Sequence, residues 1–414
     1  MQRGDRLTLT VERPAAGGRM IARHEGAIVF VAGAIPGEVV EAEVEKVQRG
    51  TAWAITRAVI AASPDRIAGA ADGGCGGCVF SHIGYERQRA IKAAIVEDSF
   101  RRLARITLDA PVDVVGSPID GYRMRARLHV RGGRIGFFRE GTHSLCDPGP
   151  TRQLRPDTLA VLLALEQALK GLGRDVVSEV ELSENVDASE RALHLELIAR
   201  LDPAPLVAAT RIAGLVGVTC APPETARTTE LWGTATVADV VSGARMSRHA
   251  RSFFQGNRFL LQPLVDHVLS HVTRGPVLDL YAGVGLFSLS AACAGHGPVV
   301  AVEGDASSAA DLRRNAAGRT DLKVRSESVE RYLPGAARAE TIVLDPPRTG
   351  LSKEALAGVI AVGASTVVYV SCDIATLARD ARLLLDAGYR LAGVRAFDLF
   401  PNTAHVETVI AFAR

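Results

Sequence analysis

The amino-acid sequence predicts an α/β fold, with a Rossmann-like parallel sheet in the C-terminal part, a small β-barrel at the N-terminus and an α+β region between them. Three observations predict it. From about residue 246 onward, short apolar strands alternate with helical stretches, which is the pattern of a parallel sheet covered on both faces. Over the first sixty or so residues, short alternating strands are separated by glycine and proline turns. The length of 414 residues leaves room for this division at about 150 residues per domain.

Composition narrows the class of protein without identifying a partner. With 47% hydrophobic and 23% charged residues the chain can build packed cores, so disorder of the whole chain is excluded. The net charge is only +2, from 48 basic and 46 acidic residues, so any surface for a polyanion has to be local. No apolar run reaches membrane-spanning length, and the first residues lack the apolar core of a signal peptide. We therefore expect a cytoplasmic protein without membrane contact, and a monomer because no leftover interface pattern is evident.

The first domain is expected at residues 1–64. Strands are predicted at 7–11, 27–31, 39–47 and 52–60. In the third of these, Val40, Ala42 and Val44 alternate with glutamates, which gives the strand one buried and one wet face. The turn at Ser63-Pro64-Asp65 ends the module.

A middle domain is expected at residues 65–245, with mixed strands and helices. Its predicted elements are helices over 85–105 and 156–170 and strands over 177–182 and 193–199. The first helix carries Val96, Phe100 and Leu103 at helical spacing, and the second has proline near its first turn.

The segment 122–139 contains six arginines and no acidic residue. On a strand, one face would hold Arg123, Arg125, Arg127, His129 and Arg131. Gly132-Gly133 then predicts a hairpin turn. A guanidinium stripe of this kind suits phosphates, and Phe137 or Phe138 could stack on an unpaired base. The alternative is a solvated edge strand.

The third domain is expected at residues 246–414, with strands at 277–280, 299–302, 341–344 and 367–370. The first strand leads into a turn with Gly283 and Gly285, where the backbone can approach a ligand closely. Glu303 ends the second strand, where an acidic side chain can bind ribose hydroxyls. Ser288 stands where a dinucleotide fingerprint has its third glycine, which favours S-adenosylmethionine over NAD. The alternative is a purely structural glycine turn.

Three further strand ends carry candidate chemistry. Asp345-Pro346-Pro347-Arg348 follows the third strand, and its prolines can form a rigid wall for a planar base. Cys372 follows the fourth strand and precedes a helix, whose amide groups can lower the pKa of a thiol. Near the C-terminus, Glu407 is a candidate general base and His405 a second titratable group. A stiffened loop, a buried thiol, a solvated carboxylate and a structural histidine are the alternatives.

Taken together and in order, these segments resemble the family of RNA uracil-C5 methyltransferases, and the resemblance runs nearly end to end. It rests on Phe253-Phe254-Gln255-Gly256-Asn257, Asp279-Leu280-Tyr281, Glu303, Asp345-Pro346-Pro347-Arg348-Thr349-Gly350, Ser371-Cys372 with Thr376-Leu377-Ala378-Arg379-Asp380, and Phe400-Pro401 with His405-Val406-Glu407. The N-terminal barrel is similar to the family's OB-type TRAM domain. The resemblance implies a class I methyltransferase domain at the C-terminus and an RNA-binding middle domain.

The resemblance also implies roles for single residues. Gln255, Tyr281, Glu303 and Asp345 would bind S-adenosylmethionine, Cys372 would be the nucleophile and Glu407 the base. Addition of a thiolate at uracil C6 gives C5 the carbanion character that it needs to attack a sulfonium methyl group. A carboxylate can then remove the C5 proton, so that the thiolate is eliminated.

The six cysteines are too few for a disulfide scaffold, and we expect them to stay reduced. Cys75 and Cys78 resemble the last part of the family's iron-sulfur signature, in which four cysteines hold a 4Fe-4S cluster. The upstream cysteine is absent, and the fourth position falls on Thr151, with Cys146 five residues earlier as a substitute ligand. We expect the cluster to be lost. Three thiols holding an incomplete cluster, or a redox pair, are the alternatives.

The barrel is commoner in the ribosomal RNA branch of the family, so large-subunit ribosomal RNA is the first expected substrate and transfer RNA the second. Two other functions compete with uracil methylation. One is a non-catalytic RNA chaperone and the other a cytosine-C5 methyltransferase. Retention of Cys372, Glu407 and the cofactor residues argues against the first, and the motif set argues against the second. Asp373-Ile374, Ala282 and Gly256 depart from the family pattern without removing a catalytic group.

Overall fold

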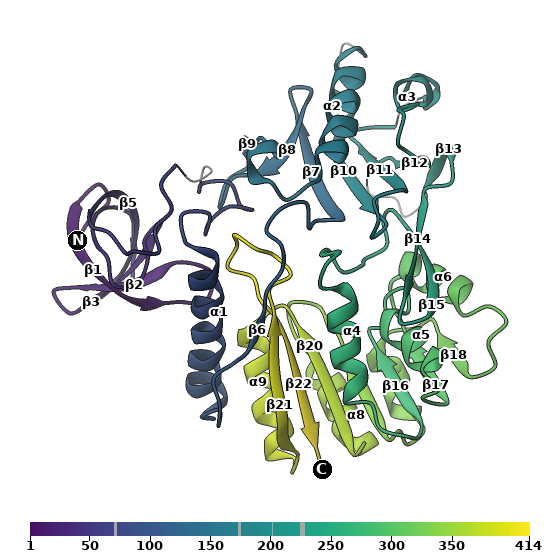
Figure 1. Cartoon of the computed structure of the whole chain (residues 1–414). Helices are drawn as coiled ribbons and strands as arrows, with labels where there is room; N and C mark the ends of the chain where they lie inside the picture. The colour runs from purple at the N-terminus through teal and green to yellow at the C-terminus, as the bar shows by residue number, and fades with distance from the viewer. Residues whose placement is uncertain (70–72, 173–174, 201, 224–227) are drawn as a thin grey trace.

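The computed structural model describes residues 1–69, 73–172, 175–200, 202–223 and 228–414. Its chain begins in a closed five-stranded barrel with the strand order β1-β2-β3-β5-β4, which confirms the barrel predicted from the sequence (Figure 1). The predicted inward residues Val40, Ala42 and Val44 are buried. The sequence analysis missed β2, which pairs with both β1 and β3. The strands are β1 (Arg6–Pro14), β2 (Met20–His24), β3 (Ala27–Ala32), β4 (Val39–Gln48) and β5 (Thr51–Ala61).

Helix α1 (Tyr85–Ser99) follows the barrel and contacts both the barrel and the C-terminal part of the molecule (Figure 1). A single helix over 85–105 was predicted, whereas the α-helix ends at Ser99 and a π-helical turn, η1 (Phe100–Ala104), continues it. Arg105 then takes a left-handed conformation, which ends the helix. The buried face of α1 is partly polar, because Gln88 and Lys92 lie among its apolar residues.

The middle of the chain forms a seven-stranded sheet with the order β13-β12-β11-β10-β7-β8-β9. The predicted helix over 156–170 is present as α2 (Pro156–Lys170), and the predicted hairpin turn at Gly132-Gly133 joins β7 and β8. A separate hairpin of β14 and β15 leads to the C-terminal part. The remaining elements are β7 (Arg125–Arg131), β8 (Arg134–Phe138), β9 (Leu145–Cys146), η2 (Gly149–Thr151), β10 (Val177–Glu184), β11 (Arg191–Leu197), α3 (Ala204–Ala209), β12 (Gly217–Ala221), β13 (Thr229–Gly233), β14 (Thr236–Val241) and β15 (Ala244–His249).

The C-terminal sheet has the order β18-β17-β16-β19-β20-β22-β21-β6. The four predicted strands, β16, β17, β19 and β20, are parallel, and β18, which was not predicted, extends them in the same direction. By contrast, β22 runs antiparallel to β20 and β21. The edge strand β6 comes from the predicted middle domain and pairs with β21. The strands are β6 (Val114–Val115), β16 (Val277–Leu280), β17 (Val299–Val302), β18 (Leu322–Arg325), β19 (Thr341–Leu344), β20 (Thr366–Ser371), β21 (Arg390–Phe397) and β22 (Glu407–Ala413).

Helices cover both faces of this sheet. Successive residues of a buried strand point to opposite sides, so each strand contributes apolar side chains to the cores on both faces. On one face, Leu278, Ile342 and Val367 share a core with α1, α8 and α9. On the other face, Val277, Val343 and Val368 pack with α4 and α5. The helices are α4 (Leu261–Ser270), α5 (Leu286–Cys293), α6 (Ala306–Asn315), α7 (Val329–Tyr332) with the turn η3 (Leu333–Gly335), α8 (Lys353–Val362) and α9 (Ile374–Asp386). Within the described residues, no helix combines the length and apolar character needed to cross a membrane.

Candidate active site

The carboxyl ends of β16, β17, β19 and β20 meet at one edge of the C-terminal sheet, which is where open α/β sheets bind their ligands. Tyr281, Glu303, Asp345 and Cys372 follow these four strands directly or within a residue. Glu407 begins β22, and it reaches the same edge because β22 runs antiparallel to β20, with Thr408 opposite Ser371. The fold therefore brings five of the predicted site residues together, namely Tyr281, Glu303, Asp345, Cys372 and Glu407.

The loop after β16 is shaped for close approach by a ligand. Gly283 and Gly285 have φ angles of 58° and 101°, which favour glycine. A Cβ at Gly285 would lie 2.7 Å from the Cδ1 atoms of Leu289 and Leu312, so a larger residue there would have to displace both side chains. Tyr281 is also left-handed, with φ 62°, an uncommon conformation for a bulky residue that recurs at functional sites.

Two carboxylates hold this loop in place. Glu303 accepts hydrogen bonds from the backbone N–H of Gly283 at 2.7 Å and of Asp305 at 2.6 Å. A carboxylate has about four lone-pair positions, so Glu303 retains capacity for ribose hydroxyls. Asp279 is fully buried beneath the loop and accepts from the N–H of Ser288 at 2.9 Å, at the start of α5.

The pocket gathers acidic groups whose pKa values are raised. Burial raises the pKa of Asp345 to about 7, and the nearby charge of Asp279 adds to the effect, while a hydrogen bond from Gln255 Nε2 at 3.3 Å opposes it. Burial also raises the pKa of Asp279 to about 7 and raises that of Glu303. A cation bound among these groups would stabilise their ionised forms. The charge of the pocket therefore fits a sulfonium ligand better than an anion.

Cys372 is half-buried between β20 and α9. Its pKa was expected to be lowered by the helix, but burial raises it to about 11, and the neighbouring Glu407 carboxylate adds to the shift. The first turn of α9 is already capped by Asp373, whose side chain accepts from the Thr376 N–H at 2.9 Å. Arg348 acts in the opposite direction and lowers the thiol pKa through its charge and a hydrogen bond.

Glu407 is buried, with 4% of its surface exposed. Burial raises its pKa well above the usual value, the charge of Asp345 raises it further, and Arg348 opposes both. His405 lies two residues earlier, and burial lowers its pKa to about 4, so its ring is neutral at physiological pH. Arg348 is thus the cation that tunes both the thiol and the carboxylate.

Helix α9 fixes the loop that carries Asp345 and Arg348. Its Asp380 is buried and accepts hydrogen bonds from the Leu351 N–H at 2.9 Å and from the Tyr369 hydroxyl at 2.8 Å. Arg379 donates to the carbonyl oxygens of Thr349 and Leu351, each at 3.2 Å. The helix that follows the candidate nucleophile therefore also fixes the position of the loop that contains Asp345-Pro346-Pro347-Arg348.

The arginine face of β7 differs from the sequence prediction. The strand is central rather than an edge, because β10 and β8 pair with its two sides. Glu181 of β10 accepts from Arg125 and Arg127, each at 2.9 Å, and His129 lies 3.1 Å from Glu179. The face is therefore not of a single sign, because acidic side chains from a distant segment lie across it.

The arginine at position 123 has a different environment. Its guanidinium donates to Gln153 Oε1 at 2.6 Å and lies over the rings of Phe137 and Phe400, at 5.2 and 5.5 Å. Of the two aromatic residues proposed for stacking on RNA, Phe137 is buried, while Phe138 stacks on His129 with 3.5 Å between ring centroids.

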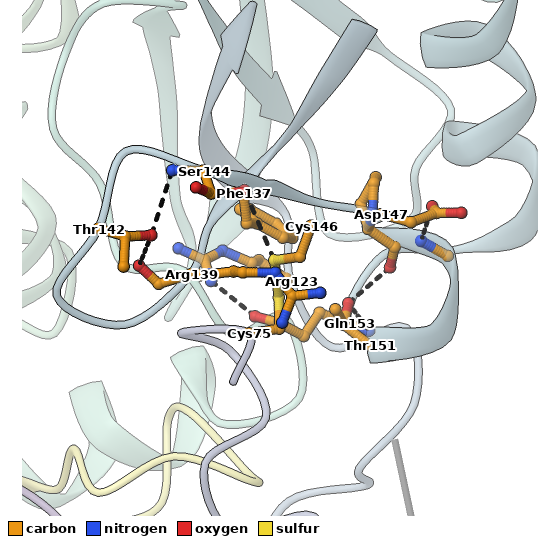
Figure 2. The surroundings of a disulfide bond; sticks show 12 residues. Cys75, Arg123, Phe137, Arg139, Thr142, Ser144, Cys146, Asp147, Thr151 and Gln153 are labelled. Atoms are coloured by element: carbon orange, nitrogen blue, oxygen red, sulfur yellow. Dashed lines mark hydrogen bonds between the residues drawn. A yellow bond between two sulfur atoms is a disulfide. The ribbon is translucent and has the colours of Figure 1, made fainter. Parts of the chain in front are cut away.

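The candidate metal ligands are arranged differently from a cluster site (Figure 2). Cys75 and Cys146 form a disulfide, which corrects the prediction that all cysteines are reduced; their Cα atoms lie 5.8 Å apart, a normal separation for such a bond. Cys78 is buried nearby, and the Thr151 hydroxyl donates to the Pro148 carbonyl at 2.6 Å. These donors do not fit a four-thiolate cluster. In the described ranges, no group of three His, Cys, Asp or Glu side chains is placed to bind a metal.

Several residues that shape the site were given no role by the sequence analysis. Arg348 is one, although its position directly after the two prolines was a usable signal. Asp380 and Lys92 are two others. Lys92 lies on the apolar face of α1, with Ile91, Ile95 and Val96. A lysine on such a face is rarely buried without a partner, so the helical periodicity could have predicted a distant acidic one.

Comparisons with known proteins agree with this geometry. A model of the TRAM domain matches residues 1–55, and a family model described as tRNA (Uracil-5-)-methyltransferase matches residues 329–414. The 23S rRNA (uracil(1939)-C(5))-methyltransferase of Marinomonas posidonica is 32% identical over 98% of this chain and 95% of the relative. The corresponding protein of Photorhabdus laumondii is 31% identical over 99% of this chain and 96% of its own.

The fold is also found among solved structures. The tRNA (uracil-54, C5)-methyltransferase of Pyrococcus abyssi, solved with S-adenosyl-L-homocysteine, has a TM-score of 0.78 over 98% of this chain and all of that one, at 22% identity. The sequence relatives cover the barrel, the middle sheet and the C-terminal sheet alike. The chain thus belongs to the family of RNA uracil-C5 methyltransferases, enzymes that transfer a methyl group from S-adenosylmethionine to C5 of a uridine in RNA.

Proposed function

We propose that this enzyme methylates a uridine of large-subunit ribosomal RNA through a covalent adduct between Cys372 and uracil C6, with Glu407 as the base. The observation that carries the assignment of residues is the antiparallel course of β22. It brings Glu407 close enough to Cys372 for the carboxylate to raise the pKa of the thiol, although 35 residues separate them in the chain. A nucleophile and a base at one strand edge are what the two proton-coupled steps at C6 and C5 require.

Gln255, Tyr281, Glu303 and Asp345 would hold S-adenosylmethionine. When bound, it supplies the methyl group on a positively charged sulfur. Glu303 is directed toward the glycine loop by the hydrogen bond from the Gly283 N–H, and a ribose can be bound there. Asp345 and Gln255 are joined to each other at the opposite wall, next to Cys372 and Glu407. This arrangement would place the methyl group between the acidic pocket and the target base.

The chain's own residues would then handle the protons. The Cys372 thiol has to lose its proton before it bonds to C6, and Arg348 favours the thiolate. As the C–S bond forms, electron density moves to C5, which takes the methyl group. Glu407 accepts the proton released from C5, and the C6–S bond breaks to give 5-methyluridine and a free thiolate. The charge of Arg348 favours the ionised form of Glu407 that this last step needs.

The choice of ribosomal RNA rests on the relatives that match the whole chain, barrel included. Several of them are described as acting on uracil 1939 of 23S rRNA. Transfer RNA is the second candidate, because the family model and the Pyrococcus abyssi structure carry that description. We also propose the division into a barrel at 1–64, an RNA-binding middle at 65–245 and a catalytic domain at 246–414, with residues 85–115 of the middle packed on the catalytic sheet. Action as a monomer in the cytoplasm stays a prediction from the sequence.

Mass spectrometry of nucleosides from a strain lacking the protein tests the substrate. Large ribosomal RNA and transfer RNA are separated first, and loss of 5-methyluridine from the large ribosomal fraction is the expected result. Loss from the transfer RNA fraction alone would replace the first candidate by the second. Re-expression of a Cys372→Ala variant should leave the uridine unmethylated, and restored 5-methyluridine would refute the covalent mechanism.

A further inference from the structure

We infer that Lys92 of α1 is a positioning residue for catalysis, which acts by fixing the loop between β21 and β22 that leads to Glu407. This loop spans residues 398–406 and is called here the 398–406 loop. The inference rests on the proposed role of Glu407 as the base. Figure 1 shows the loop in yellow, beside the upper end of α1.

Lys92 and Asp398 form an ion pair in which both side chains are 0% exposed. The Lys92 ammonium donates to Asp398 Oδ1 at 2.5 Å and to the carbonyl oxygen of Phe400 at 3.1 Å. One side chain therefore holds both the first residue of the 398–406 loop and its third. Because 306 residues separate the partners, the pair defines how α1 sits against the loop.

A second set of contacts from the same helix holds the middle of the loop. Gln88, one helical turn before Lys92, donates to Asn402 Oδ1 and accepts from the Asn402 N–H, both at 2.9 Å. The Phe80 N–H donates to the Asn402 carbonyl oxygen at 2.9 Å. Asn402 takes a left-handed conformation, with φ 63°, so these contacts fix a sharp turn. At the end of the loop, a Cβ on Gly18 of the barrel would come within 2.8 Å of Ala404.

The other side of the loop faces the active site. The Phe400 ring packs so closely on Gly256, next to Gln255, that a Cβ there would lie 3.3 Å away. The ring is also 5.5 Å from the Arg123 guanidinium and 6.1 Å from the His405 ring. Glu407 follows immediately as the first residue of β22. A shift of the 398–406 loop would therefore move Glu407 and the Phe400 ring together.

A buried ion pair is an expensive way to stabilise a fold, since apolar residues of similar size often serve as well. Its particular value is a fixed geometry, and the geometry fixed here belongs to the loop that precedes Glu407. Proton removal from C5 is the step that depends on this geometry. Addition of Cys372 depends on the position of a thiol held between β20 and α9, and methyl transfer depends on the ligand site at the ends of β16, β17 and β19. Loss of Lys92 should therefore slow the steps after methyl transfer more than those before it.

A Lys92→Met variant of the full chain tests this with two RNA substrates of identical sequence, one with uridine and one with 5-fluorouridine at the target. A base cannot remove fluorine from C5 as it removes a proton, so the second substrate traps the adduct whether or not the base is in place. We expect kcat to fall roughly 10- to 100-fold, as for a misplaced catalytic group, with KM for S-adenosylmethionine within about twofold. Adduct with ordinary uridine should accumulate on denaturing gels, while the rate of trapping by 5-fluorouridine stays unchanged. Unchanged kcat, or an equal fall of turnover and trapping, would overturn the inference.

Three further variants make the test decisive. Lys323→Met makes the same change at an exposed position on β18 and should behave as the parent protein. Asn402→Gly retains the positive φ but removes the side-chain contact with Gln88, and it should show the same pattern more weakly if Lys92→Met does not fold. Glu407→Gln should accumulate the adduct strongly. If it does not, the proposed base fails; if it does while Lys92→Met and Asn402→Gly do not, only the positioning role fails.

Discussion

Binding of S-adenosylmethionine is predicted to release protons, so that its affinity falls as the pH falls through 7. The pocket for the ligand contains Asp345 and Asp279, whose pKa values burial raises to about 7, and Glu303, whose pKa is also raised. Below pH 7 Asp345 and Asp279 are mostly protonated and neutral. A cationic sulfonium prefers the carboxylate forms, so protons have to leave as it binds.

The size of the effect follows from the pKa of Asp345, the acid next to Gln255. If only the ionised form binds the cation, the apparent dissociation constant is multiplied by 1 plus 10 to the power of (7 − pH), with 7 as the pKa. The factor is about 11 at pH 6 and about 1.1 at pH 8, a tenfold loss of affinity or ~1.4 kcal/mol. At pH 7, where half of the groups are protonated, Asp345 alone should release about 0.5 proton per ligand.

Isothermal titration calorimetry in two buffers of different ionisation enthalpy measures both quantities. The ligand's own amino group titrates near pH 8, so Asp345→Asn is the matched control in which that contribution remains. The variant should bind more weakly and lose the tenfold contribution of Asp345 to the difference between pH 6 and pH 8. Equal pH dependence in the variant and the parent protein, or equal affinity at the two pH values in the parent, would refute the reasoning.

The remaining predictions concern the thiols and Arg348. Cys372→Ala should abolish turnover while RNA binding, measured by filter retention, survives; measurable methyl transfer would contradict the role of the thiol. Arg348→Met removes a charge that lowers the pKa of Cys372, so this pKa should rise above its value of about 11. Alkylation of the thiol by iodoacetamide at pH 9 should therefore slow several-fold. The same rate in both proteins would show that Arg348 does not act on the thiol. The disulfide between Cys75 and Cys146 closes a loop with a sequence separation of 71, and its reduction should lower the free energy of unfolding by about 4 kcal/mol. Denaturant curves with and without dithiothreitol measure this, with a Cys75→Ser and Cys146→Ser double variant as the reduced reference; superimposable curves would contradict it.

The sequence predicted the buried strands best. The bounds of β16, β17 and β19 agree with prediction, because each is a short apolar run with a glycine, proline or acidic residue at its end. The direction of β22 and the joining of β6 to the sheet could not be predicted, because apolar pattern contains no information on pairing partners. Strand β2 was missed because its apolar run stops after Met20-Ile21-Ala22, before Arg23 and His24, and because it follows a glycine turn.

The sequence identified the positions of the site residues, but not the pKa values of their side chains or the charges around them. The helix after Cys372 suggested a lowered thiol pKa, whereas burial raises it, and Glu407 and Asp345, which come from other strands, raise it further. The arginines of β7 appeared single-signed for the same reason, since Glu179 and Glu181 lie some 50 residues further along the chain. Charge at a site depends on neighbours in space, and a local sequence window contains few of them.

The two-residue strand β6 has a consequence for protein engineering. It pairs with β21 at the outer edge of the catalytic sheet, and apolar residues of α1 share a core with one face of that sheet. A fragment starting at residue 246 would expose the backbone of β21 as a free edge and lose the apolar cover that α1 provides, and both changes promote aggregation. An exchange of RNA-binding modules between enzymes of this kind therefore has to carry residues 85–115 with the catalytic part, although the sequence places them in front of the middle sheet.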